Sequence, residues 1–185
     1  AEVWRVSPDG EIRDTFRKIR YVFAMRECDF FKGYSEGREN VEVSYYKQCI
    51  QMDADVRSKL PEVPLSNIWV ASQLAHRIPE DSVIHFGILN SLRAWNLFKL
   101  PDTVRSSSNV GGFGIDGGMS TLVGASYANP EKLYYLVIGD LAFFYDMNVL
   151  GNRHLGKNLR IILVNNGRGT EFRNYGHHTS HFGID

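Results

Sequence analysis

Short, continuous runs of apolar residues recur along most of the chain, and segments with helical periodicity separate them. The clearest runs are 133–138 and 159–164, and shorter candidates lie at 83–86 and 103–105. Continuous apolar runs of this length are typical of strands that are buried on both faces, as in parallel sheets. Helical patterns lie at 41–59, 66–78, 91–97, 119–127 and 143–154. Ser66 is the predicted N-cap of the helix at 66–78.

The alternation of strands and helices predicts an α/β fold. A helix that connects two parallel strands lies on one face of their sheet, and successive connections can cover both faces. We therefore predict three layers for residues 41–185: a mostly parallel sheet with helices on both faces. Residues 1–40 follow a different pattern and are predicted to be the end of a preceding domain with a connector.

The pattern in the first 40 residues combines a turn with a helical repeat. Ser7–Gly10 has the composition of a tight turn, since proline presets φ and glycine accepts a positive φ. It lies between the short segments 3–6 and 11–13, and a polar, glycine-containing stretch follows at 33–37. Three apolar residues recur at helical spacing between them: Phe16, Ile19 and Phe23.

Composition and charge narrow the class of protein. The 185 residues include 21 basic and 21 acidic side chains, so no general affinity for nucleic acid is expected. No apolar stretch approaches the length of a membrane span, and Cys28 and Cys49 are too few for a disulfide framework. We therefore predict a cytoplasmic protein without a membrane segment. The chain starts at Ala1 without a signal sequence, which suggests a piece of a longer polypeptide.

Polar residues follow the two clearest apolar runs, at the point where each predicted strand ends. Gly139-Asp140 follows the first run, and Asn165-Asn166 follows the second. Parallel strands leave their carboxyl ends at one edge of the sheet, where α/β proteins bind ligands. A carboxylate and an amide oxygen that meet at this edge suit Mg²⁺ carrying a diphosphate.

A glycine-rich turn supports a second interpretation. Gly112, Gly114 and Gly117 fit the pattern GxGxxG between a possible strand and a helix. Asp140 follows at roughly the distance at which a dinucleotide-binding fold carries its ribose-binding acid. An NAD-dependent oxidoreductase is therefore an alternative, although it gives Asn165-Asn166 no role. The glycines can also serve only as a tight turn between sheet and helix.

Taken together, these residues resemble the cofactor-diphosphate domain of thiamine diphosphate-dependent enzymes, whose signature is Gly-Asp, a spacer of this length and Asn-Asn. Within that family the strongest likeness is to the menaquinone-pathway synthases of a succinyl-enolpyruvyl-hydroxycyclohexene-carboxylate. The resemblance implies the thiamine diphosphate-binding fold, incomplete at its C-terminus, with thiamine diphosphate and Mg²⁺ as cofactors. Four segments in matching order and spacing carry it: Gln73–Ile78, Asn90–Leu92, Gly114–Gly117 with Ser120-Thr121, and Gly139–Leu141 with Tyr145–Asn148.

The resemblance also assigns cofactor-binding roles to individual residues. Asp140 and Asn166 would bind Mg²⁺ through side-chain oxygens, and Arg168 would bind it through its backbone carbonyl. The backbone amides of Leu141 and Ala142 would meet the diphosphate at the start of a helix. The full implied set is Asn90, Ser91, Phe113, Ile115, Gly139, Asp140, Leu141, Ala142, Asn166 and Arg168.

The other members of this set would contact different parts of the cofactor. Ile115 matches the bulky residue that bends thiamine diphosphate so that its amino group faces the thiazolium carbon. The Ile115 amide and the Phe113 carbonyl would hold the pyrimidine ring. Asn90 and Ser91 match positions that line the diphosphate end.

The implied reaction is decarboxylation of a 2-oxo acid, followed by transfer or release of the acyl carbanion equivalent. In the family, a glutamate on a separate pyrimidine-binding domain, usually of a partner subunit, activates the cofactor. No glutamate of this chain lies in a matching motif, so no catalytic residue is predicted here. The expected partners are a 2-oxo acid and the pyrimidine-binding domain of a homodimer or homotetramer. A catalytically degenerate structural or regulatory subunit is the non-enzymatic alternative.

Two positions depart from the menaquinone-pathway synthases. Trp95 and Val110 stand where those enzymes have arginines that bind substrate carboxylates. Losing two bidentate carboxylate ligands predicts a different or less acidic substrate. Arg93 or Arg105 could compensate from a shifted position.

Two further groups of polar residues have an open role. His177, His178 and His181 resemble a metal cluster, but their glycine, serine and threonine neighbours favour a solvated tail. Asp146 and Asn148 follow Asp140 on the predicted helix, where they would either orient the site or cap a helix.

Overall fold

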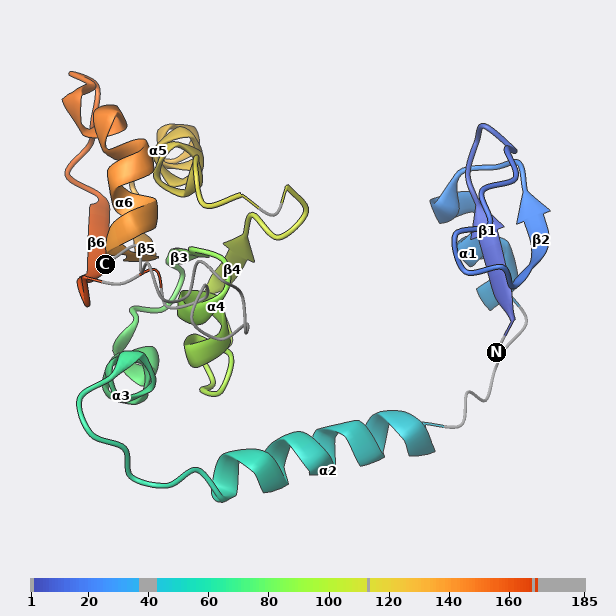
Figure 1. Cartoon of the computed structure of the whole chain (residues 1–185), viewed down its shortest axis with the longest axis horizontal. Helices are drawn as coiled ribbons and strands as arrows, with labels where there is room; N and C mark the ends of the chain where they lie inside the picture. The colour runs from blue at the N-terminus through green and yellow to red at the C-terminus, as the bar shows by residue number, and fades with distance from the viewer. Residues whose placement is uncertain (1, 37–42, 113, 168, 170–185) are drawn as a thin grey trace, which may run out of the picture. The chain divides into compact units, whose positions relative to one another are not determined.

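The computed structural model describes residues 2–36, 43–112, 114–167 and 169 (Figure 1). The chain divides into two units, residues 1–54 and 55–185. The helix α2 (Ser44–Ser58) spans the division between them. The domain division predicted after residue 40 stays a prediction.

The first unit contains two parallel strands and a helix. β1 (Val3–Val6) pairs with β2 (Ile19–Phe23), and α1 (Glu27–Ser35) follows. The helical prediction for residues 16–23 is therefore wrong, and the polar stretch that begins at Gly33 overlaps the end of α1. Residues 11–13 lie between the strands but belong to neither of them.

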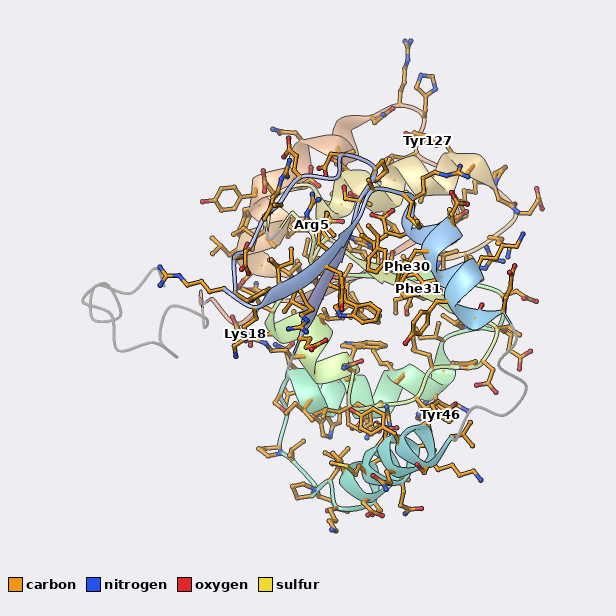
Figure 2. The ribbon with its side chains drawn as sticks, turned by 90° about the vertical axis from the view of Figure 1, so that its right-hand side faces the viewer. Arg5, Lys18, Phe30, Phe31, Tyr46 and Tyr127 are labelled. Carbon is orange, nitrogen blue, oxygen red and sulfur yellow. The ribbon has the colours of Figure 1, made fainter. Side chains whose placement is uncertain are left out.

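Ring contacts explain why β2 is extended. Residues two apart on a strand point to the same face, whereas on a helix they point to different sides. Tyr21 and Phe23 share such a face, and both contact Trp4 of β1, with ring centroids 5.5 and 5.7 Å away. Phe30 of α1 packs on Phe23 at 4.8 Å. Figure 2 labels Phe30 on this helix. An extended β2 therefore brings both of its rings to Trp4.

The turn predicted after β1 is present. The Gly10 amide donates to the Ser7 carbonyl at 3.1 Å, and Gly10 has the predicted positive φ, 62°. The Asp9 carboxylate accepts hydrogen bonds from the Arg5 guanidinium at 2.6 Å and from the Glu11 amide at 2.9 Å. These two bonds, the Arg5 bond first, lower the pKa of Asp9 below its usual range.

Within the described residues, the second unit is built on a parallel sheet of four strands. The strand order is β4-β3-β5-β6, and every pair of neighbours is parallel. The predictions at 83–86 and 159–164 are confirmed, and the other two strands begin one or two residues later than predicted. Their bounds are β3 (Val83–Phe86), β4 (Arg105–Ser108), β5 (Tyr134–Gly139) and β6 (Leu159–Val164).

Helices cover both faces of this sheet. One core contains side chains of α3 (Asn67–Leu74) and α4 (Asn90–Trp95) packed on Ile84, Phe86 and Val137. The other contains side chains of α5 (Gly118–Ala128) and α6 (Asp140–Asp146) packed on Leu136 and Ile138. Successive residues of β5 therefore enter opposite cores, as strand geometry requires. Figure 1 shows α5 and α6 beside each other. The three-layer α/β prediction is confirmed.

The helix starts follow local signals. The Ser66 hydroxyl accepts from the Trp69 amide at 3.2 Å, so Ser66 caps α3 as predicted, and the 3-10 helix η1 (Ala75–Arg77) continues α3. The helix predicted from residue 143 instead begins at Asp140, directly after β5, and gives way to the 3-10 helix η2 (Met147–Gly151). In the described part of the chain, no helix is both long and apolar enough to cross a membrane.

Candidate functional site

The candidate site lies at the carboxyl end of the parallel sheet, where the direction of the strand order reverses. β3 is connected through α4 to β4 on one side, whereas β5 is connected through α6 to β6 on the other. Because α4 and α6 cover opposite faces, the turns after β3 and β5 diverge and leave a crevice between two neighbouring strands. Open α/β sheets usually bind ligands at such a point.

A cavity of about 560 Å³ occupies this crevice. Phe113 and Arg168 lie outside the described residues, as do His177, His178 and His181. The structure brings together the other eight residues predicted to bind the cofactor, although their roles as ligands stay predictions. The predicted residues that line the cavity are Asn90, Ser91, Ile115, Gly139, Asp140, Leu141, Ala142 and Asn166.

Asp140 is 7% exposed, and its carboxylate joins the ends of β5 and β6. Oδ2 accepts from the amides of Asn166 at 3.1 Å and Gly167 at 2.6 Å. Oδ1 accepts from the amide of Leu141 at 2.8 Å. A carboxylate has about four acceptor positions, so these three bonds leave about one, on Oδ1. Asp140 can therefore bind a cation through Oδ1 while it holds the loop after β6 in place.

The oxygens near Asp140 suit a cation that arrives with ligands of its own. Asn166 lines the same cavity and adds a side-chain amide. Across the described ranges, no three histidine, cysteine, aspartate or glutamate side chains are grouped so that they could hold a metal ion. Mg²⁺ is commonly held by one or two carboxylates plus substrate phosphates and water. One carboxylate with one amide therefore fits Mg²⁺ better than a metal that needs a complete protein cage.

A contact between two helices lies directly after the turn that carries Ile115. Gly117 ends this turn with φ 90°, a conformation that favours glycine, and α5 begins at the next residue. The Asp146 carboxylate, at the end of α6, accepts from the amide of Ser120 at 2.6 Å and from its hydroxyl. Asp146 therefore caps α5 and ties it to the helix that starts at Asp140. Asn148, the other residue of that pair, is exposed in η2.

Other residues that line the cavity escaped the sequence analysis. Leu89, directly before Asn90, has φ 66° and ψ −119°, a conformation that costs a leucine about 1 to 3 kcal/mol. Backbone strain of this kind clusters at ligand sites, but no sequence signal marks it here. Asn67 and Tyr145 also line the cavity. The sequence predicted the helices that carry these two residues. It did not predict that their side chains reach the cavity, because that depends on how α3 and α6 pack.

The strand order bears on the alternative with a dinucleotide cofactor. In that fold, the strand with the glycine motif is the direct neighbour of the strand with the ribose-binding acid. Here Gly112, Gly114 and Gly117 follow the edge strand β4, while Asp140 follows β5, and β3 lies between the two strands. The arrangement therefore differs from the one that positions NAD.

The positions that depart from the family motif do not line the candidate cavity. Trp95 and Val110 line a second cavity, of about 510 Å³. Trp95 is 3% exposed, and its ring lies 5.6 Å from that of Phe86 in the core. Of the two arginines considered as substitutes, Arg105 opens β4 at the amino end of the sheet, whereas Arg93 lies on α4 at the carboxyl end. Arg105 therefore lies at the end of the sheet opposite the candidate cavity, and the compensating role of either arginine stays a prediction.

Along most of its length the chain is similar to proteins named 2-succinyl-5-enolpyruvyl-6-hydroxy-3-cyclohexene-1-carboxylate synthase. It is 38% identical to that of Bacteroides fragilis and 34% identical to that of Bacteroides thetaiotaomicron, in each case over 92% of this chain. It is 40% identical to that of Christiangramia forsetii over 62% of this chain. The chain spans 30%, 30% and 20% of the length of these relatives, respectively. No family model matches the chain.

These similarities confirm the resemblance that the motifs indicated. The chain is a relative of the menaquinone-pathway carboxylate synthases, and it shares with them the resemblance to thiamine diphosphate-dependent enzymes. An NAD-dependent oxidoreductase gains no support from these relatives.

Proposed function

We propose that the chain binds the diphosphate and Mg²⁺ of thiamine diphosphate. We further propose that it forms part of an enzyme that decarboxylates a 2-oxo acid and transfers or releases the acyl carbanion equivalent. One observation carries the proposal: segments far apart in the sequence bring Asp140, Asn166 and Ile115 to one cavity where the strand order reverses. Similarity to the carboxylate synthases supports this cofactor over NAD.

The residues of the cavity fit the diphosphate end of this cofactor. Asp140 would bind Mg²⁺ through its remaining position on Oδ1, Asn166 would add its amide oxygen, and the carbonyl of Arg168 would complete the protein ligands. The first turn of α6 brings Leu141 and Ala142 to the cavity. The dipole at a helix start favours a negatively charged diphosphate there.

Other residues would orient the cofactor and shield it from water. Ile115 would support the bend between the two rings, on the turn that precedes α5, and Asp146 joins the first turn of α5 to α6. Ile88 and Leu89 contribute apolar surface to the same cavity. When bound, thiamine diphosphate would supply the electron sink that decarboxylation requires. The protein would contribute position, charge and exclusion of solvent.

A complete active site would need a second contribution. The family resemblance places the activating glutamate on a pyrimidine-binding domain, which we propose is supplied by a partner subunit in a homodimer or homotetramer. The substrate would be a 2-oxo acid. In this proposal the residues of this chain hold the cofactor and the metal, and the glutamate of the partner acts on the pyrimidine.

Calorimetric titration of the natural, full-length protein tests the proposal. Thiamine diphosphate should bind only when Mg²⁺ is present, and NAD should not bind. Binding of NAD alone, or of neither compound, would contradict the proposed cofactor. A screen of 2-oxo acids for release of carbon dioxide then tests the reaction. Cofactor binding without turnover would identify a catalytically degenerate subunit instead of an enzyme.

A further inference from the structure

The pair Ser120-Thr121 belongs to the segments that carry the family resemblance, but the residues predicted to bind the cofactor do not include it. Both residues are exposed and lie in the first turn of α5. Neither of them lines the candidate cavity, so neither would touch a ligand bound there. Their side chains instead form hydrogen bonds with the segments that carry the cavity lining. A role in positioning that lining is therefore the one to examine.

Ser120 joins α5 to the helix that carries Asp140. The Asp146 carboxylate accepts hydrogen bonds from the amide and the hydroxyl of Ser120. Asp140 is the first residue of α6, and Asp146 is its last. Hydrogen bonds to a charged acceptor are stronger than those between neutral groups. The bonds to Asp146 therefore fix the start of α5 relative to the helix that begins at the proposed metal ligand.

Thr121 joins the two ends of the glycine-rich segment before α5. Its hydroxyl donates to the carbonyl of Gly117 at 2.7 Å and accepts from the side-chain amide of Asn109 at 3.3 Å. Asn109 directly follows β4, and Gly117 directly precedes α5. Ile115 lies between them in the sequence and lines the candidate cavity. One hydroxyl thus connects both ends of the segment that brings Ile115 to the cavity.

We propose that Ser120 and Thr121 are positioning residues that set the distance between the two ends of the cofactor site. Asp140 marks the metal end, and Ile115 marks the end that would hold the rings of the cofactor. This inference rests on the proposed function, because it names residues that orient the proposed cofactor. A ligand bound at two points gains affinity when the second point is held at the matching distance. Loss of either hydroxyl therefore weakens a ligand that spans both ends, but not one that occupies the metal end alone.

Calorimetric titration of the natural, full-length protein with two probes tests this distinction. Thiamine diphosphate with Mg²⁺ spans both ends, whereas inorganic pyrophosphate with Mg²⁺ occupies only the metal end. Thr121→Val keeps the shape of the side chain and removes its hydroxyl. It should weaken thiamine diphosphate about three- to tenfold, the loss expected for one neutral hydrogen bond. Ser120→Ala should act in the same direction but less strongly, because the amide bond to Asp146 remains. Both variants should bind pyrophosphate as the parent does.

Two control variants separate positioning from a general effect on α5. Thr121→Ser keeps the hydroxyl and should bind thiamine diphosphate as the parent does. Ser126→Ala removes a hydroxyl farther along α5, which donates to the carbonyl of Val123 at 2.7 Å, and should leave both affinities unchanged. Three results would overturn the inference: equal losses for the two probes in Thr121→Val, parent-like affinity for thiamine diphosphate in Thr121→Val, or an equally large loss in Ser126→Ala.

Hydrogen exchange without any ligand tests the positioning role independently of the cofactor. The backbone amides of residues 114–117 should exchange faster in Thr121→Val than in the parent, and unchanged in Ser126→Ala, because local opening of the turn becomes easier. If the turn loosens in this way but the parent binds no thiamine diphosphate, only the proposed function fails. If the parent binds thiamine diphosphate but exchange in Thr121→Val is unchanged, only the positioning role fails.

Discussion

The two ends of the parallel sheet use buried polar side chains for different purposes. At the amino end, Asn158 directly precedes β6 and is 8% exposed, close to the 7% of Asp140 at the carboxyl end. The Asn158 side chain donates to the carbonyls of Lys132 at 3.1 Å and Ser126 at 3.5 Å. These bonds join the residue before β6 to α5 and to the loop before β5, so Asn158 connects three segments at the amino end of the sheet.

Asp140 also bonds to backbone groups, but the structure around it is open. Its carboxylate lines a cavity of about 560 Å³ and keeps an acceptor position on Oδ1. Leu89, which lines the same cavity, has a strained backbone. Burial and backbone hydrogen bonds alone therefore do not distinguish a structural polar residue from a ligand. Asp140 differs from Asn158 in having a remaining acceptor position next to open volume, and this difference supports the proposed role of Asp140 as a ligand.

The largest effect is expected for Asp140→Ala, which removes both the proposed cation ligand and the hydrogen bonds that join the ends of β5 and β6. Mg²⁺-dependent binding of thiamine diphosphate should weaken by at least about 100-fold, as measured by calorimetry. The free energy of unfolding, measured with denaturant, should fall by about 1 to 3 kcal/mol, because buried amides lose their acceptor.

Asp140→Asn is the matched variant, because it keeps the size of the side chain and one acceptor oxygen. It should recover part of the stability but little of the cofactor affinity. Parent-like affinity in Asp140→Asn would mean that the carboxylate charge does not hold the metal, and the proposed difference between the two ends would disappear.

Asn158→Ala should affect stability alone. Two backbone carbonyls lose their donor, so the free energy of unfolding should fall by about 1 to 3 kcal/mol. Cofactor affinity, measured where the variant is fully folded, should stay within about twofold of the parent. A loss of affinity as large as that of Asp140→Ala would show that the amino end also contributes to the site.

The strain at Leu89 predicts an unusual order of stability. Leu89→Gly should be more stable than Leu89→Ala by about 1 kcal/mol, because glycine accepts φ 66° without a β-carbon clash. At Leu92, inside α4, the order should be reversed, since glycine is a poorer helix former than alanine by about 1 kcal/mol. Thermal or denaturant unfolding of the four variants measures both differences. The same order at both positions would mean that Leu89 is not strained.

The smallest effect concerns His85 on β3, which is 2% exposed and hydrogen-bonded to Ser107 at 2.8 Å. Burial lowers the pKa of His85, and a contact with Asn109 opposes this change in part. The unfolded chain, with a histidine pKa of about 6.5, therefore binds the proton more tightly than the folded protein. The free energy of unfolding should fall as pH drops below about 6.5.

Denaturant unfolding at several pH values between about 5 and 7 measures this dependence. His85→Gln should reduce the slope, because it removes the buried imidazole. The opposite result is a free energy of unfolding that rises toward low pH in the parent but not in His85→Gln. It would show that the folded protein favours the charged form of the imidazole.

Local signals in the sequence predicted the elements of the second unit well. The strands 83–86 and 159–164 were predicted residue for residue, and Ser66 was recognised as a helix cap. Prediction failed for residues 19–23, where Ile19 and Phe23 have helical spacing but the segment is a strand. Its pairing with β1 and its ring contacts with Trp4 join distant positions, which periodicity does not register.

The amino-acid order placed Gly139-Asp140 and Asn165-Asn166 at the ends of buried strands and so indicated a metal–diphosphate site. Strand order was decided only by the tertiary fold, because it depends on which distant segments pair and which helix faces pack. That order put β3 between the glycine motif and Asp140, and brought Asn90 to the same cavity as Asp140. Packing also buried Trp95 in the core against Phe86, although the sequence alone marks it only as a departure from the family motif.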